Sequence, residues 1–222
     1  MISIIAPVLN EATALPEFLA HARSLEGDKE IIVVDGGSSD GTADLARQTP
    51  GVRVLAAQRG RGAQIQVGAE IAKGEVVLAL HADCRLPRNA LRAIDSHGAQ
   101  WGWFDIEYAS RRPSVRAVAW GLNRWARTLG SPVGEQAVFA RRDVWERAGG
   151  CPTVPLMEDL LLARRLRSVA PGTPLPGPVT CSSRRYEAWS VTGMGLRCAL
   201  LLTGFHLGVP PSALSRLYPP IR

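Results

Sequence analysis

A chain of 222 residues, 46% of them hydrophobic, is long enough for one core of ordinary size, so we expect a single domain spanning 1–222. Its opening residues, MISIIAPVLNE, lack the basic segment and long apolar stretch of a secretory signal, and no later apolar run is long enough to span a bilayer. The four cysteines form no CxxC pair, which argues against a zinc site or a disulfide framework and favours a reducing, cytoplasmic location.

The net charge of +6 is distributed unevenly along the chain. Residues 1–100 contain 10 basic and 12 acidic side chains, whereas residues 101–222 contain 16 and 8. The basic residues are nearly all arginines, which suit phosphate contacts but are equally explained by a codon bias toward arginine. Because no DNA-reading motif and no aromatic RNA-binding pattern accompanies them, we expect no nucleic-acid partner.

Apolar, often β-branched runs alternate with helix-like stretches through the first 100 residues. The runs lie at 3–8, 30–36, 52–57 and 75–83, and the helical patterns lie around 12–24, 40–48 and 61–73. This alternation is typical of βαβ units, in which helices cover both faces of a parallel sheet. We therefore predict an α/β fold with a mostly parallel central sheet and helices on both faces.

The alternation of apolar runs and helix-like stretches becomes less regular after about residue 100. An alternating strand is predicted at 101–109, a helix at 116–130 and a rigid surface loop in the proline-rich stretch 170–178. The apolar segment 193–209 predicts a further helix, for which two interpretations stay open. It either packs inside the protein, or lies in the interface of an anionic membrane next to a basic half of the chain.

Polar residues follow every predicted strand of the first half. In parallel sheets ligands bind at the carboxyl ends of the strands, so these residues are the informative ones. They are PVLNE at 7–11, DGGSSDGT at 35–42, RGRGAQ at 59–64 and HAD at 81–83. Each stretch alone is explained as well by a turn, a helix cap or a solvated charge. Their coincidence at one edge of one sheet predicts a ligand site.

The residue types at this edge indicate a nucleotide diphosphate. Neither GxGxxG nor GxxxxGK[ST] occurs between a strand and a helix, which disfavours a Rossmann oxidoreductase and a P-loop kinase. Asp35 can accept a hydrogen bond from a base or a ribose, and Arg59 and Arg61 can bind phosphate. Asp83 is a hard oxygen ligand that suits Mg²⁺ or Mn²⁺, because these ions bind through one or two carboxylates and the oxygens of a diphosphate.

Four motifs in this order, APVLNE, VVDGGSSDGT, LHADC and MEDLLLARRLR, resemble the metal-dependent inverting glycosyltransferases of family 2, whose fold is called GT-A. The resemblance covers about residues 2–168, and the ending SSRRYEAW resembles a bacterial subgroup of small stand-alone enzymes. It implies a nucleotide-sugar donor half at about 1–100 and an acceptor and catalytic-base half at about 101–222. The residues that it assigns to the nucleotide pocket are Pro7, Glu11 and Asp35.

The resemblance also implies roles around the reacting groups, with one departure. Asp83 matches the last aspartate of the family's DxD metal motif, but His81 stands at its first position, so the metal role depends mainly on Asp83. His81 either ligates the ion through a neutral imidazole or hydrogen-bonds the ribose or diphosphate. Asp159 matches the catalytic base and follows Glu158; the alternative for this pair is that it only caps a helix.

Further positions follow from the same resemblance. Inverting transfer needs a base for the acceptor proton and cations for the leaving diphosphate. Glu135 and Gln136 lie where the family carries an acceptor-side motif. The run Arg184, Arg185 and Tyr186 resembles a shortened Arg-aromatic motif, and an arginine such as Arg185 would neutralise the diphosphate.

The expected function is therefore metal-dependent transfer of a sugar from a UDP- or GDP-type donor to an acceptor hydroxyl. It would occur in the cytoplasm, with peripheral association at the inner face of the cell membrane as an option. A nucleotidyltransferase acting on a sugar phosphate is the second hypothesis, disfavoured because PVLNEATALPE stands where such enzymes carry a glycine-rich loop. A non-catalytic nucleotide-binding module is the third, and the presence of Asp83 and Asp159 argues against it.

Overall fold

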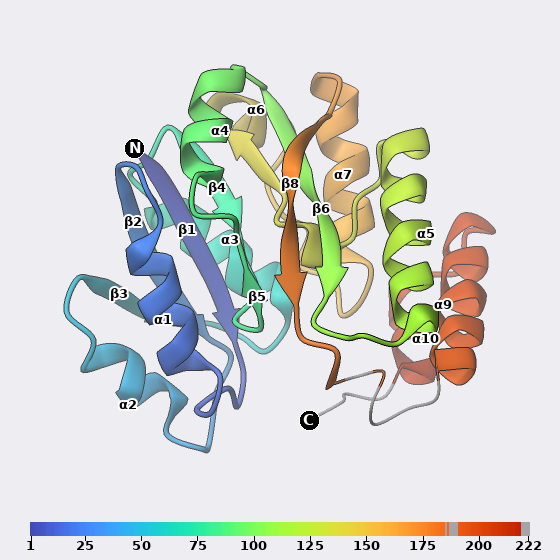
Figure 1. Ribbon diagram of the computed structural model, residues 1–222, viewed down its shortest axis with the longest axis horizontal. Helices are drawn as coiled ribbons and strands as arrows, with labels where there is room; N and C mark the ends of the chain where they lie inside the picture. Colours follow the sequence, from blue (N-terminus) through green and yellow to red (C-terminus); the bar gives the residue numbers. More distant parts are fainter. Residues whose placement is uncertain (185, 187–190, 219–222) are drawn as a thin grey trace.

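The computed structural model describes residues 1–184, 186 and 191–218, and it is built around a mixed sheet with the strand order β3-β2-β1-β4-β7-β6-β8-β5 (Figure 1). The strands are β1 (Ile2–Val8), β2 (Lys29–Asp35), β3 (Val52–Ala56), β4 (Val76–Ala79), β5 (Cys84–Arg85), β6 (Trp101–Tyr108), β7 (Phe139–Arg141) and β8 (Thr173–Cys181). The α-helices are α1 (Leu15–Ser24), α2 (Thr42–Arg47), α3 (Arg61–Ile71), α4 (Ala90–His97), α5 (Pro113–Leu129), α6 (Arg142–Arg147), α7 (Glu158–Val169), α9 (Val191–His206) and α10 (Pro211–Leu214). Short 3₁₀ turns lie at η1 (Gly134–Gln136) and η2 (Ser215–Leu217).

The predicted parallel sheet is present in the first half of the chain. β1 pairs in parallel with β2 and β4, and β2 pairs in parallel with β3, so the carboxyl ends of all four strands lie at one edge. The second half joins through the antiparallel pairs β4–β7 and β6–β7, and β8 runs parallel to β6. The α/β prediction is confirmed, and the short strands β5 and β7 are among the elements that the sequence pattern did not indicate.

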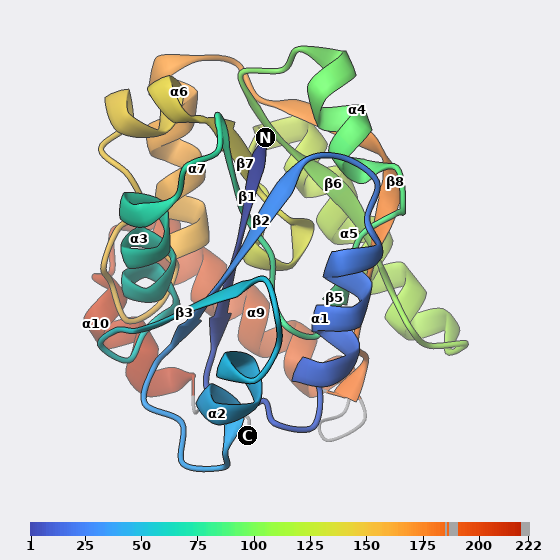
Figure 2. The same cartoon turned by 90° about the vertical axis from the view of Figure 1, so that its left-hand side faces the viewer.

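Helices cover both faces of the sheet, as predicted (Figure 2). The side chains of β1 alternate between them: Ile4 packs in the same cluster as Phe18 of α1, and Ile5 packs with Ile65 of α3 on the other face. Alternation with a period of two is what a strand buried on both sides requires. On the side of Ile5, the sheet is also covered by α6 and α7, which contribute Val144 and Leu166 among others. Two apolar layers thus fix the sheet whose edge carries the site.

The prediction of a loop at 170–178 is wrong, because β8 occupies most of this stretch. β8 pairs with β6 along its length, but on its other side it pairs with β5 only at Thr180 and Cys181. The earlier residues therefore have an open edge, where a proline costs no ladder hydrogen bond. The register with β6 also shifts between Phe104 and Asp105, which accommodates two extra residues of β8 as a bulge.

Gly62 in α3 gives a test of how closely this helix packs. A Cβ added at Gly62 would overlap the carbonyl oxygen of Pro152, whereas one added at Gly121 in α5 would meet no described atom within 4 Å. We expect Gly62→Ala to lower the free energy of unfolding by about 1–3 kcal/mol through overpacking. The matched change Gly121→Ala should raise it by about 0.5–1 kcal/mol, as alanine normally does inside a helix. Denaturant unfolding followed by circular dichroism measures both, and equal stabilisation by the two changes would contradict the close contact.

Candidate active site

The loops that follow β1 and β2 are hydrogen-bonded to each other. The Asn10 N–H donates to the Ser38 hydroxyl at 2.8 Å, and the Glu11 N–H donates to the Thr42 hydroxyl at 2.8 Å. The Thr42 hydroxyl in turn donates to Asp40, and this hydrogen bond holds the pKa of Asp40 below its usual value. Two segments that are about 30 positions apart in the sequence therefore form one rigid rim at the edge of the sheet.

Asp35 ends β2 with one carboxylate oxygen bound and the other available. Its Oδ2 accepts hydrogen bonds from the N–H groups of Gly37 and Ser38, each at 3.0 Å. Its Oδ1 is buried and has no hydrogen-bond partner among the described residues. Leaving a buried acceptor unsatisfied costs about 1–3 kcal/mol, so this atom is placed to accept a hydrogen bond from a ligand. Pro7, in contrast, is a buried residue of β1 that pairs with Val34.

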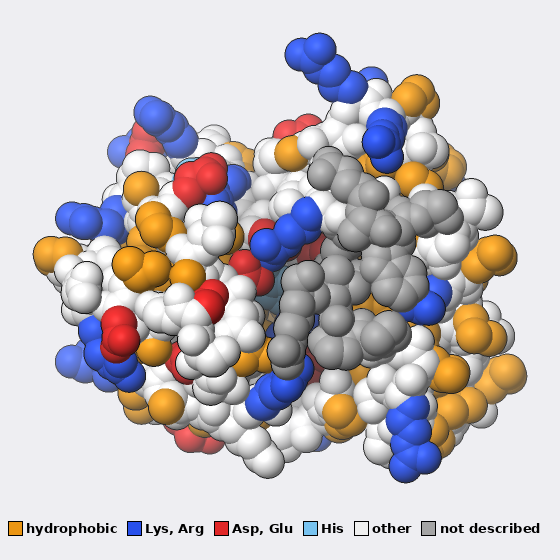
Figure 3. Space-filling model, turned by 90° about the horizontal axis from the view of Figure 1, so that it is seen from below, with side chains coloured by type: hydrophobic (Ala, Val, Ile, Leu, Met, Phe, Trp, Pro, Cys, Tyr) orange, Lys and Arg blue, Asp and Glu red, His pale blue; other side chains and the backbone are white. Residues whose placement is uncertain are grey.

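Arg184 joins two of the predicted donor residues. Its Nη2 lies 2.8 and 3.0 Å from the two carboxylate oxygens of Glu11, and 3.4 Å from Oδ2 of Asp83. One guanidinium thus links the loop after β1, the residue before β5 and the segment that follows β8. Figure 3 looks onto this edge of the molecule, where acidic and basic side chains meet near the centre. Arg185, the other predicted arginine, lies outside the described residues.

His81 and Asp159 converge on Gly134. The Gly134 N–H donates to Asp159 Oδ2 at 2.8 Å, and a Cβ added at Gly134 would lie 3.0 Å from His81 Cε1 and 3.6 Å from Asp159 Oδ2. The three residues line the same small pocket. Asp159 Oδ1 accepts the N–H of Leu160 at 2.8 Å in the first turn of α7. Each carboxylate oxygen keeps a further lone pair, so Asp159 is held in place and can still accept a proton.

Glu158 and Arg61 form an ion pair beside Asp159. Arg61 Nε lies 2.7 Å from Glu158 Oε1, and the Glu158 side chain is almost fully buried. From the sequence, Arg61 was predicted to bind the diphosphate and Glu158 to lie beside the catalytic base. In the structure the two side chains form an ion pair at the first residues of α3 and α7. Arg59 is exposed on the loop between β3 and α3.

A cavity of about 130 Å³ extends from Asp159. Its polar end also includes Glu135 and Arg61, and its walls come from apolar residues of α5, α7 and α9, among them Leu160 and Leu201. Tyr108 lies in this polar end, and its hydroxyl donates to Glu135 Oε2 at 2.6 Å. Burial and the nearby Glu135 raise the pKa of Tyr108, so it stays a hydrogen-bond donor. Tyr108 was not among the residues predicted from the sequence, although it lies near the end of the strand predicted at 101–109, where a site residue would be expected.

Gln136, predicted to contact an acceptor, is instead fully buried. Its Oε1 accepts the Val133 N–H at 3.0 Å, and its Nε2 lies 3.3 Å from Asn123 Oδ1 and 3.4 Å from the Phe104 carbonyl oxygen. Both ends of the amide are therefore used within the protein. The side chain supports the turn at Gly134 that places Asp159, while its neighbour Glu135 lines the cavity.

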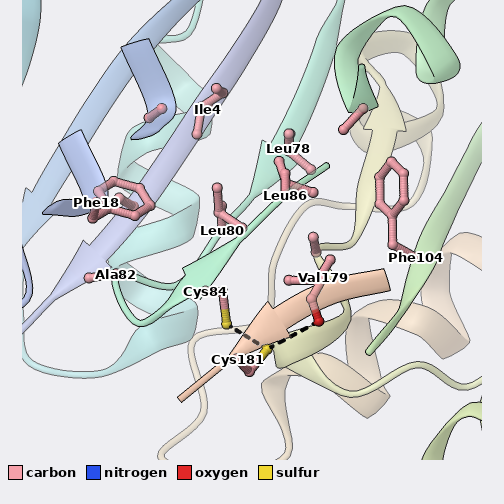
Figure 4. Close-up of a cluster of buried hydrophobic side chains, with 14 of the residues drawn as sticks. Ile4, Phe18, Leu78, Leu80, Ala82, Cys84, Leu86, Phe104, Val179 and Cys181 are labelled. Carbon is pink, nitrogen blue, oxygen red and sulfur yellow. Dashed lines mark hydrogen bonds between the residues drawn. The ribbon is translucent and has the colours of Figure 1, made fainter. Parts of the chain in front are cut away.

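Cys84, next to Asp83, belongs to the core. Its sulfur lies 2.9 Å from that of Cys181 on the paired strand β8, among apolar side chains that include Leu80 and Phe104 (Figure 4). The hydrogen bond with Cys181 and burial raise the pKa of the Cys84 thiol. A neutral, buried thiol is a poor nucleophile, which agrees with the interpretation of Cys84 as a small packing residue.

The carboxylates at this edge fit a divalent ion that binds together with a diphosphate. Within the described residues, no group of three or more His, Cys, Asp and Glu side chains is arranged to hold a metal ion. Asp83 and Glu11, both contacted by Arg184, supply hard oxygen atoms at the place where the diphosphate is expected. Mg²⁺ usually binds proteins through one or two carboxylates plus substrate phosphates and waters, so this donor set suits an ion shared with the substrate.

Comparisons with known proteins agree with the geometry. The model of the family described as "Glycosyl transferase family 2" matches residues 3–112. A Pseudomonas paraeruginosa protein named undecaprenyl-phosphate 4-deoxy-4-formamido-L-arabinose transferase is 34% identical over 140 residues, which is 58% of this chain and 40% of that protein. The protein of the same name from Aeromonas hydrophila is 34% identical over 98 residues, 39% of this chain and 30% of that protein. The chain thus spans less than half the length of these curated relatives.

Solved structures share the fold. The TarS 1–349 structure from S. aureus has a TM-score of 0.66 and 20% identity, covering 82% of this chain and 60% of that one. The mannosyltransferase PcManGT from Pyrobaculum calidifontis, in complex with GDP-Man and Mn²⁺, has a TM-score of 0.63 and 23% identity, covering 85% and 59%. The glycosyltransferase family 2 model thus matches just under half of the chain, at residues 3–112, and the solved structures show that the chain has their GT-A fold.

Proposed function

We propose that this protein transfers a sugar from a nucleoside-diphosphate sugar to an acceptor hydroxyl, with inversion and with Asp159 as the general base. The observation that carries the proposal is the position of Asp159. It lines the small pocket that also contains His81 and the larger cavity that contains Glu135. A base must reach the acceptor proton while the acceptor faces the sugar, and Asp159 lies where those two spaces meet.

The donor side is proposed to bind a UDP- or GDP-type nucleotide. TarS 1–349 was solved in complex with UDP-GlcNAc, and PcManGT in complex with GDP-Man, which supports a donor of this class. The unpartnered Oδ1 of Asp35 would accept a hydrogen bond from the ribose or base. Pro7 and the rim that includes Glu11 would enclose the nucleotide, and Arg59 and Arg61 would approach its phosphates.

Asp83, with Glu11 nearby, is proposed to hold Mn²⁺ or Mg²⁺ against the diphosphate. When bound, the ion offsets the negative charge that develops on the leaving nucleoside diphosphate. Arg184 already contacts both carboxylates and would share this task, because its guanidinium can also bind phosphate oxygens. His81 is proposed to hydrogen-bond the donor beside Gly134, and Arg185 stays a proposed donor residue from the sequence.

The acceptor is proposed to enter the cavity with a hydroxyl at its polar end. Glu135, fixed by Tyr108, would orient that hydroxyl toward Asp159, while Glu158 holds Arg61 at the same end. The apolar walls from α5, α7 and α9 favour an acceptor with an apolar body. The curated relatives are named for transfer involving undecaprenyl phosphate, a lipid, which supports the same class. We place the reaction in the cytoplasm or at the inner face of its membrane.

Donor binding and inversion can be tested without knowing the acceptor. Thermal shifts with UDP, GDP, CDP and ADP, each with Mn²⁺ or with EDTA, should be largest for UDP or GDP and should disappear in EDTA. Slow hydrolysis of the matching nucleotide sugar, followed by proton NMR at early times, should release the anomer opposite to that of the donor. Release of the same anomer would contradict inversion, and equal shifts for all nucleotides in EDTA would contradict the proposed donor site.

A further inference from the structure

Helix α9 exposes a stripe of leucines to solvent. Leu196 and Leu200 are 69% and 60% exposed, and their spacing of four residues places them on one side of the helix, while Leu207, in the turn just after α9, is 80% exposed. The opposite side of α9 is buried and lines the cavity through residues such as Met194 and Leu201. Since both sides are apolar, packing within the described structure accounts for only one of them.

Helix α5, which faces α9 through Leu122 and Trp125, exposes a further tryptophan on its other side. Trp120 is 70% exposed, and Arg116 and Arg124 lie one helical turn to either side of it. α5 lies beside α9 in Figure 1, and the Trp125 and His206 rings from the two helices lie 5.5 Å apart. Orange side chains run along the right-hand edge of Figure 3, where these helices lie. Tryptophan flanked by arginines is the composition of segments that lie at a membrane–water interface.

The positive charge of the protein is concentrated on the same two segments. Residues 109–134, which contain α5, include five arginines and no acidic residue, and residues 188–222, which contain α9, include three arginines and no acidic residue. The remainder of the chain has 18 basic and 20 acidic residues, so it carries a small negative charge against a total of +6. The exposed apolar residues therefore lie in the part of the molecule that attracts an anionic surface.

We propose that the surface formed by Leu196, Leu200 and Leu207 docks on an anionic lipid bilayer. A second copy of the chain would place the basic helices α5 and α9 against the same two basic helices, so charge disfavours self-association through this face. A nucleic acid would use the arginines but would leave the leucines in water. None of the described helices combines the length and apolar character needed to cross a bilayer, so the docking is peripheral.

Docking of α9 would also place the cavity next to lipid. The inner side of the helix lines the cavity that contains Asp159, so a bilayer beneath the outer side would bring lipid-linked hydroxyl acceptors within its reach. This consequence depends on the proposed function, whereas lipid binding itself does not. A failure of binding and a failure of catalysis are therefore separate results.

Co-sedimentation with vesicles tests the docking. Vesicles of phosphatidylcholine with 30 mol% phosphatidylglycerol, an illustrative composition, should sediment most of the protein at low salt, and pure phosphatidylcholine should not. Added salt should weaken the binding, because surface charges are screened over about 8 Å at physiological ionic strength. The double change Leu196→Ser and Leu200→Ser should reduce the bound fraction by about tenfold or more, since both changes remove apolar area that the bilayer would bury. Both positions are exposed, so the fold should persist, and circular dichroism checks it.

Two matched controls distinguish binding through this surface from nonspecific adsorption to the vesicles. Leu45→Ser removes an exposed leucine of α2, and Arg47→Gln with Arg147→Gln removes two exposed arginines outside α5 and α9. The controls should bind vesicles nearly as the unchanged protein does, whereas Arg116→Gln with Arg124→Gln should weaken binding. Recovery of the unchanged protein in the supernatant with both lipids at low salt would overturn the proposal. So would size-exclusion chromatography showing a dimer that the two serine changes dissociate.

Discussion

Asp159→Asn should lower the turnover number by about 10²- to 10⁴-fold, the usual contribution of a positioned general base. The amide has the size of the carboxylate and keeps one oxygen that can accept from the Gly134 or Leu160 N–H, but it cannot take a proton at pH 7. Donor affinity, measured by calorimetry with a nucleoside diphosphate and Mn²⁺, should change little. The reason is that the proposed function assigns Asp159 to the acceptor side of the site.

Asp44→Asn provides the matched control for this change. Asp44 is also an acidic residue in the first turn of a helix, α2, but it is exposed and paired with Arg47. If Asp159 only stabilised its helix through the helix dipole, both changes would lower the melting temperature slightly and neither would change the turnover number. Collapse of donor affinity in Asp159→Asn, with normal turnover of the donor that does bind, would assign Asp159 to the donor site instead.

The first half of the fold was predictable because local patterns decide it. β1, β2 and β4 are largely buried on both faces, so each is an apolar run with polar residues after it, and such a run has few other interpretations, whereas β3 is a partly exposed edge strand. The strand end at Asp35 followed directly, since the position of a carboxylate after such a run fixes its place in the sheet. The same reasoning placed His81 and Asp83 at the tip of β4.

The second half was less predictable because its pairings are long-range and irregular. β8 contains prolines that local rules assign to a loop, and only its open edge toward solvent makes them acceptable. The contact between Arg184 and Asp83 joins positions 101 residues apart, which no spacing rule reveals. The buried state of Gln136 depends on Asn123 and Phe104, which come from other elements. The pairing of Arg61 with Glu158 likewise arises only when α3 and α7 pack together.

The apolar helix at 193–209 shows why sequence left two interpretations open. Leucines on both sides of a helix satisfy the pattern of a buried helix and that of an interfacial one. The structure separates the two sides, because Leu201 is buried against the cavity and Leu200 is exposed. The packing interpretation therefore describes the inner side of α9, and the interfacial interpretation stays a proposal for its outer side.

Asp83→Ala should abolish the part of donor affinity that depends on metal while leaving the fold intact. Asp83 is the carboxylate that follows β4, and its loss leaves Glu11 as the acidic partner of Arg184 at this place. Loss of the partner of a metal ligand typically weakens metal binding by about 10- to 100-fold, and loss of a ligand should cost at least as much. Calorimetry with UDP or GDP, in Mn²⁺ and in EDTA, measures the difference.

The variant should bind the nucleotide in Mn²⁺ as weakly as the unchanged protein binds it in EDTA. Asp95→Ala, at an exposed position of α4, is the control and should retain the metal-dependent gain. Arg184→Ala should weaken binding in both conditions, because a guanidinium binds phosphate whether or not an ion is present. If Asp83→Ala instead weakened binding equally in Mn²⁺ and in EDTA, Asp83 would act by orienting Arg184, and the metal would have to be held elsewhere in the site.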